Sequence, residues 1–378
     1  MSTYLMHYDL CRSLGGICDS REIPYLIGGP YFAQPEVREE WLGIPGLSGL
    51  VGGEVEFELC EIVQAATRRA SLDSFHGVWT HDPHKPNAAP LHNLDDVPFP
   101  DFSDFPWSKY PNRILPLAAG RGCSWGGCTF CGDVTGTVGR RYRSRSAENV
   151  LAEMEYQSQR FGTSSFVFTD PKLNSNLTVW DALLGELPTR LPGASWIGAV
   201  HIDANRPNGL SRSELRCARK AGMVRLTTGL ESGSQRVLDL MKKGVQLEAS
   251  AETIDSAAAE DISVRVTMIV GYPGERTEDV LRTAEFLERH SNAIERVALN
   301  RFHIITGTRI HRSIEDQPEN YPAITRRSPN HRLAIVDHDL TVPDSAEYRK
   351  AVDRALLVTH RINRRPLRPH AKTFEGVM

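Results

Sequence analysis

Between Arg113 and His303 the chain alternates short apolar runs with amphipathic segments, and this alternation limits the possible folds most strongly. Six apolar runs have the length of buried strands: 114–119, 165–170, 196–202, 225–229, 264–271 and 296–302. Helical segments are predicted between them: 146–160, 211–222, 235–243, 249–260 and 277–290. Repeated strand-then-helix units of this length build a parallel sheet with right-handed crossovers. The pattern therefore predicts an α/β fold containing a partial (β/α)6 barrel.

Polar residues and glycines follow the carboxyl ends of these predicted strands. In TIM-like barrels the functional groups gather at that end of the strands. The residues placed there are the cysteine-rich segment 123–131, Asp170 with Asn174, His201 with Asp203, Glu231 with Ser232, the segment 271–275, and His303. We expect them to form one polar rim. For each single residue outside the cysteine-rich segment, a helix cap or a turn remains the alternative.

Three of the seven cysteines, Cys123, Cys128 and Cys131, lie within nine residues in the spacing C-x4-C-x2-C. Thiolates are soft ligands that suit iron, and three of them on one loop can hold a cubane cluster whose fourth iron stays open to a small molecule. The alternatives are a zinc site with a distant fourth ligand, and three unrelated thiols. A zinc ribbon would need a second C-x2-C pair, and the sequence has none.

Length and charge narrow the function classes. A chain of 378 residues predicts one large domain and a smaller one. A net charge of -3 argues against a nucleic-acid binder, and the basic segments 140–143 and 361–368 are expected to be solvated, although 140–143 could hold an anionic group of a substrate. Neither a signal peptide nor an apolar run near the ~20 residues of a membrane span is present. We therefore expect a cytoplasmic protein in which the four remaining cysteines, Cys11, Cys18, Cys60 and Cys217, are buried thiols.

Residues 1–72 are predicted to form a small α/β domain. Its pattern is a helix at 5–21, strands that run into glycine turns at 23–30 and 49–54, and a helix at 55–70 whose apolar side is Phe57, Leu59, Ile62, Val63 and Ala66. Residues 73–112, rich in proline and aromatic residues, are predicted to be a linker. The barrel is placed at 113–310, and a C-terminal helical extension, with a helix at 345–361, at 311–378.

With these motifs the chain resembles radical S-adenosylmethionine (radical SAM) enzymes, and among them the branch with an N-terminal cobalamin (B12)-binding domain. Four motifs carry the resemblance, over roughly residues 110–310: Gly122-Cys123 with Cys128-Thr-Phe-Cys131-Gly132, Gly229-Leu-Glu-Ser-Gly-Ser-Gln235, Met241-Lys-Lys-Gly244, and Gly271-Tyr-Pro-Gly-Glu275. Their order and spacing match the family.

The resemblance implies a [4Fe-4S] cluster on Cys123, Cys128 and Cys131, with S-adenosylmethionine chelating the fourth iron. Reductive cleavage of this cofactor would give a 5′-deoxyadenosyl radical that abstracts hydrogen from a small-molecule substrate, including natural products. A reducing partner such as flavodoxin or ferredoxin is implied, and neither a membrane nor a nucleic acid is expected as a partner.

The resemblance also implies residue roles. Phe130 would lie near the adenine, Glu231 and Ser232 near the ribose and methionine, and Asp170 near the methionine amine. The wall beside the adenine would come from Met268, Ile269, Gly271, Pro273 and Gly274. Tyr272 and His201 are the candidates for catalytic groups.

The sequence departs from the family pattern at three points. The first cysteine gap has four residues instead of three, which Gly126 and Gly127 can absorb, and His201 stands where relatives often carry an arginine. The N-terminal domain lacks the strands that would precede 23–30, so it is either a truncated remnant or begins upstream of Met1. If cobalamin nevertheless binds, C-methylation becomes the alternative reaction. A non-catalytic iron–sulfur or zinc binding module is a further alternative.

Overall fold

The computed structural model describes residues 7–132, 142–203, 207–340 and 346–377. These residues divide into two compact units. The first unit contains residues 7–93, 129–132 and 303–339. The second unit contains residues 94–128, 142–203, 207–302, 340 and 346–377. Of the predicted basic segment 140–143, Arg140 and Arg141 lie outside the described residues.

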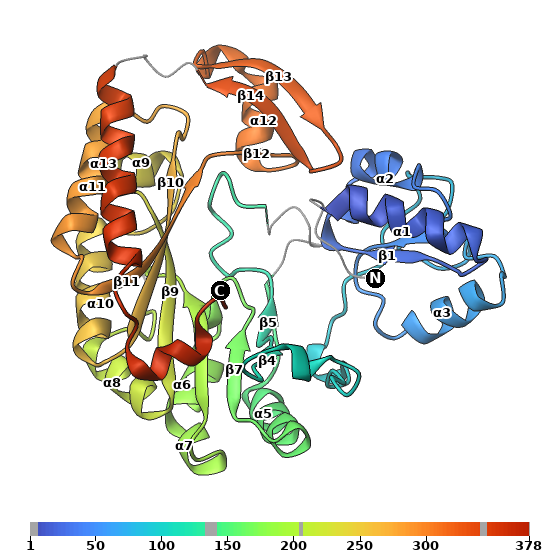
Figure 1. Cartoon of the computed structure of the whole chain (residues 1–378), viewed down its shortest axis with the longest axis horizontal. Helices are drawn as coiled ribbons and strands as arrows, with labels where there is room; N and C mark the ends of the chain where they lie inside the picture. The colour runs from blue at the N-terminus through green and yellow to red at the C-terminus, as the bar shows by residue number, and fades with distance from the viewer. Residues whose placement is uncertain (1–6, 133–141, 204–206, 341–345, 378) are drawn as a thin grey trace. The chain divides into compact units, whose positions relative to one another are not determined.

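The second unit is built on one six-stranded parallel sheet in the order β11-β10-β9-β8-β7-β4. Its strands are β4 (Leu115–Leu117), β7 (Ser165–Phe168), β8 (Ser195–Val200), β9 (Met223–Glu231), β10 (Ser263–Val270) and β11 (Ile294–Arg301). Figure 1 shows this sheet curving, with helices along its outer side. Each strand lies where the sequence predicts one, and the sheet fits a partial TIM-like barrel.

The helices between these strands lie where the sequence predicts them. They are α5 (Ala147–Phe161), α8 (Arg212–Lys220), α9 (Gln235–Leu240), α10 (Leu247–Ala259) and α11 (Thr277–Arg289). Ser146 accepts a hydrogen bond from the Asn149 N–H, and Ser211 forms a capping box with Glu214. The predicted helix starts at these two serines are confirmed.

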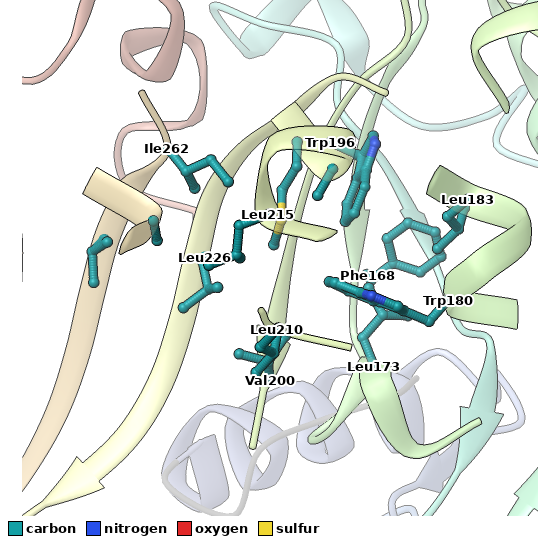
Figure 2. Packing of buried hydrophobic residues seen from close by; sticks show 14 of the residues in the cluster. Phe168, Leu173, Trp180, Leu183, Trp196, Val200, Leu210, Leu215, Leu226 and Ile262 are labelled. Carbon is teal, nitrogen blue, oxygen red and sulfur yellow. The ribbon is translucent and has the colours of Figure 1, made fainter. Parts of the chain in front are cut away.

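Two further helices, α6 (Leu177–Gly185) and α7 (Leu187–Arg190), were not predicted. Helix α6 is apolar over most of its length, so no amphipathic period marks it in the sequence. Its Trp180 ring meets Trp196 of β8 edge-on at 6.0 Å, and the two indole N–H groups donate to the carbonyls of Gly209 and Ala221. Figure 2 shows both rings among the aliphatic side chains between sheet and helices.

The C-terminal residues return to the sheet in two ways. Helix α13 (Ala346–Asn363) packs small side chains, Ala351 and Ala355, against Val280 and Ala284 of α11. The 3-10 helix η7 (Pro369–Phe374) places Phe374 in a small apolar cluster with strand residues of β7, β8 and β9. The predicted helix at 345–361 is confirmed, but the adjoining basic segment is not a solvated tail, because Arg368 donates to the Ile262 carbonyl at 2.7 Å.

The first unit has a three-stranded sheet in the order β1-β2-β3, with β1 and β2 parallel and β3 antiparallel to β2. Its elements are α1 (Tyr8–Ser20), β1 (Leu26–Gly28), η2 (Pro30–Ala33), α2 (Pro35–Leu42), β2 (Gly49–Val51), α3 (Leu59–Thr67) and β3 (Val78–Trp79). Strand β3 lies inside the predicted linker. On the predicted apolar side of α3 only Ile62 and Ala66 are buried, whereas Phe57, Leu59 and Val63 are exposed.

A second small sheet of the first unit has the order β12-β14-β13. It consists of β12 (Ile304–Ile305), β13 (Ile324–Asn330) and β14 (Ile335–Leu340), with helix α12 (Arg309–Asp316) between β12 and β13. The prediction of a purely helical extension from 311 is therefore wrong. Polar side chains dominate the two later strands, so no apolar run reveals them in the sequence. Within the described residues, no helix is long and apolar enough to cross a membrane.

Candidate functional site

The cysteine loop, residues 122–132, starts from a short antiparallel pair, β5 (Gly120–Arg121) with β6 (Arg143–Ser144). Asp170, just past the end of β7, accepts the Ala119 N–H at 2.9 Å and is 3% exposed. Burial raises the pKa of Asp170 to about 6, although backbone hydrogen bonds from Ala119 and Gly120 oppose the rise. In the structure Asp170 thus anchors the start of the cysteine loop.

No disulfide joins any of the seven cysteines, all of which lie in the described residues, and the three of the loop are half-buried. Cys123 and Cys128 belong to the second unit, while Cys131 falls in the first. Burial raises the pKa of the Cys128 thiol, and the nearby charge of Lys243 acts in the opposite direction. Outside the loop, Cys60 and Cys217 are exposed, contrary to the expectation that they are buried.

Trp125 fills the first cysteine gap and reaches the turn that follows α9. Its Nε1–H donates to the Lys242 carbonyl at 3.1 Å, and its ring stacks on the His201 imidazole at 5.7 Å between centroids and 21° between planes. A Cβ atom at Gly244 would overlap the Trp125 ring. Gly126 adopts a φ of +56°, so a glycine does absorb the additional residue, as the sequence suggested. Sequence reasoning missed Trp125 itself.

Glu231 and Lys243 form a buried ion pair at the carboxyl end of β9, with 3.3 Å between Oε1 and Nζ. Thr267 of β10 also donates to Glu231 Oε1, at 3.4 Å. A Cβ at Gly229 would overlap Glu231 Oε1 and lie 2.8 Å from the Lys243 ammonium, so a larger residue at this position would displace the ends of both side chains. Glu231 itself has a φ of +68°, a conformation that costs a non-glycine residue on the order of 1 kcal/mol or more.

His201 is held by its backbone and leaves one ring nitrogen without a partner. Asn174 accepts the His201 N–H and donates to the His201 carbonyl, both at 3.0 Å. The side chain is 6% exposed, and Nε2 has no hydrogen-bond partner among the described residues. Burial, followed by the charges of Lys243 and Lys172, lowers the pKa of His201 to about 3. The imidazole is therefore neutral and offers Nε2 for a hydrogen bond to a ligand.

Ser232, a predicted ligand contact, is engaged with helix α11. It is completely buried, its hydroxyl accepts the Ser234 N–H at 3.1 Å, and the Thr283 hydroxyl lies 3.3 Å away. The next residues continue this network, because Ser234 donates to Asp279 at 2.6 Å and Asp279 pairs with Arg236. The Ser232 hydroxyl thus fixes the turn after β9, and its contact with a cofactor stays a prediction.

The two predicted adenine contacts of β10 lie on opposite faces of that strand. Met268 is fully buried in the core between sheet and helices, whereas Ile269 is half-buried, like Thr267 two residues earlier. Because side chains alternate along a strand, only Ile269 shares the face that bears Thr267 and its bond to Glu231. Ile269 therefore remains the better candidate for a contact with a ligand.

The turn after β10 is held from inside the second unit. Gly271 and Gly274 have φ values of +83° and +86°, and Pro273 is buried between them. The Tyr272 hydroxyl donates to the Leu240 carbonyl at 3.3 Å, so it is already engaged. A catalytic role for Tyr272 stays a prediction.

Glu275 closes the same turn. Its Oε2 accepts the Gly271 N–H at 2.7 Å and the Tyr348 hydroxyl at 2.9 Å, which links the turn to α13. Its Oε1 is buried without a partner among the described residues. Burial raises the pKa of Glu275 to about 7. The carboxyl group is therefore partly protonated near neutral pH.

The described residues contain no ready-made group of three His, Cys, Asp or Glu side chains that could hold a metal ion. The cysteine loop passes from the second unit to the first after Cys128. Its later residues Phe130 and Cys131 are half-buried and belong to the first unit. By donor type the three thiols suit an iron–sulfur cluster. Ligation by all three cysteines rests on their spacing, and the position of Phe130 against a cofactor stays a prediction.

A cavity of about 720 Å³ lies in the first unit, lined by residues between Cys18 and His81. Arg69 and Glu22 pair beside it at 3.0 Å, and both side chains are exposed. None of the predicted site residues lines this cavity. It therefore takes no part in the site described above.

Comparison with known families and proteins identifies the barrel. Residues 117–287 match the family model described as the radical SAM superfamily. An uncharacterized methyltransferase of Pyrococcus horikoshii is 24% identical over 274 residues, which are 70% of this chain and 57% of that protein. An anaerobic magnesium-protoporphyrin IX monomethyl ester cyclase of Rubrivivax gelatinosus is 26% identical over 278 residues, 69% of this chain and 48% of that protein. The chain thus spans about half the length of these curated relatives.

Two solved structures share the fold of this chain. The cobalamin-dependent S-adenosylmethionine radical enzyme OxsB, with aqua-cobalamin and S-adenosylmethionine bound, superposes with a TM-score of 0.71 at 17% identity, covering 92% of this chain and 56% of that one. The radical S-adenosylmethionine methyltransferase TsrM of Kitasatospora setae, with tryptophan substrate and a SAM analog bound, gives 0.71 at 15% identity, covering 93% and 74%. The shared fold extends beyond the residues that the family model matches.

Proposed function

Because the chain belongs to the radical SAM superfamily of enzymes, we propose that it cleaves S-adenosylmethionine reductively and acts on a small-molecule substrate. Membership in this superfamily implies a [4Fe-4S] cluster and S-adenosylmethionine as cofactors. Cys123, Cys128 and Cys131 would hold the cluster. Together the bound cofactors would supply the 5′-deoxyadenosyl radical that removes hydrogen from the substrate. A low-potential protein such as flavodoxin or ferredoxin would deliver the electron.

The observation that carries this proposal is the set of groups around the first two cysteines. The Glu231–Lys243 pair is buried at the end of β9, and His201 Nε2, just past β8, has no partner among the described residues. Trp125 of the Cys123–Cys128 segment stacks on His201, and the charge of Lys243 acts on the Cys128 thiol. Buried charges and an orphan ring nitrogen are unfavourable in a chain that binds nothing there. They are expected where a polar cofactor with an amine, a carboxylate and ribose hydroxyls is bound.

The side chains at this rim suit separate tasks. Lys243 and Thr267 both contact Oε1 of Glu231. The other oxygen of this carboxylate can therefore accept hydrogen bonds from ribose hydroxyls. Lys243 favours the thiolate form of Cys128, which is the form that binds metal. His201 stays neutral at physiological pH, so it can bind a ligand through Nε2 without adding charge to the site.

The test is anaerobic reconstitution of the full chain with iron and sulfide, followed by reduction, addition of S-adenosylmethionine and measurement of 5′-deoxyadenosine. We expect product from the wild type and none from Cys123→Ala, Cys128→Ala or Cys131→Ala, all of which should also lose iron. Cys217→Ala is the matched control, because Cys217 is an exposed thiol outside the loop. An intact, reduced cluster that gives no 5′-deoxyadenosine would contradict the proposal and favour a non-catalytic module.

Cobalamin-dependent C-methylation is the second candidate, since OxsB is a cobalamin-dependent enzyme and TsrM is a methyltransferase. In this chain the space beside Gly52 is filled, because a Cβ there would lie 2.9 Å from the Trp79 ring and 3.1 Å from Phe32. That glycine therefore serves the contact with Trp79, and a remnant domain without cobalamin stays a prediction. Cobalamin absorbance in protein reconstituted with the cofactor would instead support methylation.

A further inference from the structure

The four-residue gap between Cys123 and Cys128 contains one large side chain, Trp125, and its indole has three anchors outside the loop. They are the Lys242 carbonyl, the His201 ring and the bare Cα of Gly244. The backbone of the same segment adds a weaker bond from the Ser124 N–H to the Ser175 hydroxyl at 3.4 Å. A surface tryptophan would need none of these contacts, so the additional residue has a defined place in the fold.

The turn that receives Trp125 also carries Lys243. Lys242 accepts the indole N–H and Gly244 makes room for the ring, so Trp125 contacts the residues on both sides of Lys243. The Lys243 ammonium in turn pairs with Glu231 and acts on the Cys128 thiol. The position of the indole therefore sets the distance between the cysteine segment and the cation beside it.

We propose that Trp125 is a positioning residue that fixes the Cys123–Cys128 segment against the 242–244 turn and the His201 ring. Its role is to hold the thiols in register with Lys243 rather than to touch the reacting atoms. The consequence for a bound cluster rests on the proposed function, whereas the contact itself can be tested in the cluster-free chain. Residues that orient metal ligands in this way typically change metal affinity or activity by about 10- to 100-fold when replaced.

The contact is tested by a double-mutant cycle on the cluster-free full chain, with thermal unfolding as the readout. Gly244→Ala combines a φ of +69° with overlap of the Trp125 ring, whereas the control Gly162→Ala has a φ of +61° and nothing within 4 Å. We expect Gly244→Ala to lower the midpoint more than Gly162→Ala does. In a Trp125→Ala background the two glycine substitutions should lower the midpoint by the same amount. If Gly244→Ala still lowers it more than Gly162→Ala does, by the same margin as in the wild type, the contact is overturned.

The positioning role is tested on the reconstituted chain through iron content and the midpoint potential of the cluster. Trp125→Ala should shift the potential and release iron faster, while Trp125→Phe, which keeps a ring to stack on His201, should recover most of the wild-type values. An unchanged potential and iron content in Trp125→Ala would overturn the proposal even if the chain is less stable. Failure of every variant and of the wild type to bind a cluster would instead contradict the proposed function, leaving the unfolding cycle to decide the contact.

Discussion

At the scale of single residues, Glu275 shows how burial changes a carboxyl group. Two donors, the Gly271 N–H and the Tyr348 hydroxyl, share Oε2, while Oε1 has no partner among the described residues. Loss of water around the group outweighs these bonds, so its pKa rises to about 7. The sequence shows a glutamate in a turn but not that this glutamate is buried under α13.

Glu275 makes stability depend on pH. The pKa of Glu275 is 4.5 in the unfolded chain and about 7 in the folded protein, so between these two pH values the folded state binds one more proton. The contribution of Glu275 to stability is therefore highest below pH 4.5 and is lost as pH rises through 7. The loss is on the order of 3 kcal/mol. We expect Glu275→Gln to flatten this fall, measured by urea unfolding at pH 5 and pH 8. Asp170 also lowers stability as pH rises, and it does so equally in the wild type and in Glu275→Gln. If stability falls with pH equally steeply in these two proteins, Glu275 is not buried as described.

The buried Glu231–Lys243 pair gives a second prediction at this scale. Lys243→Met leaves the Glu231 carboxylate without its cation, and breaking a buried pair in this way costs about 3 to 5 kcal/mol. The double variant Lys243→Met with Glu231→Gln should recover part of that loss, because no buried charge is left unpaired. Denaturant midpoints of the wild type, Lys243→Met and the double variant check the expectation. A single variant as stable as the wild type would mean that water reaches Glu231.

At the scale of elements, the C-terminal 3-10 helix η7 is held by arginines of three neighbouring strands. Arg225 of β9 donates to the carbonyls of Phe374, Val377 and Ala371, Arg265 of β10 to Val377, and Arg296 of β11 pairs with Glu375 at 2.8 Å. Arg225 is 2% exposed, and burial, then its two arginine neighbours, lowers its pKa. Local sequence pattern cannot reveal this docking, because the partners are about 80 to 150 residues apart.

Replacing Arg225 should release this segment. Arg225→Met removes the hydrogen bonds that this charged side chain donates to three carbonyl groups, and each such bond contributes about 1.5 to 3 kcal/mol. We expect a marked drop in the thermal midpoint and cleavage after residue 365 in limited proteolysis. Arg289→Met is the control, since Arg289 is exposed on α11. Protection of the C-terminal residues in Arg225→Met would contradict the role of this arginine.

At the scale of the whole molecule, the first unit is assembled from distant parts of the chain. Trp41 of α2 donates its indole N–H to the Arg332 carbonyl at 3.1 Å, and Glu40 pairs with Arg332 at 2.6 Å. The end of the cysteine loop joins this unit, because the Ile310 N–H donates to the Thr129 carbonyl at 2.9 Å. The last residues of the loop therefore depend on the folded first unit, although the three cysteines are close in sequence.

This dependence predicts that the N-terminal residues are needed for cluster binding. Deleting residues 1–93 keeps all three cysteines of the loop but removes Trp41 and the core around it. We expect the iron content after reconstitution to fall well below that of the full chain. Trp41→Ala tests the same point without deletion, since loss of a fully buried tryptophan costs about 3 to 5 kcal/mol. Full iron content in both variants would show that the first unit is dispensable for the cluster.

The sequence by itself determined the six strands, the caps at Ser146 and Ser211, and the spacing of the cysteines, because these features depend on local periodicity and on neighbouring residues. The tertiary structure decided which side chains are already engaged in contacts within the protein and which remain available to a ligand. Ser232 is engaged by α11, His201 keeps a ring nitrogen that pairs with none of the described residues, and Trp125 reaches the turn at Gly244. These outcomes follow from contacts between strands far apart in the sequence, where burial and hydrogen bonding set the chemistry of each side chain.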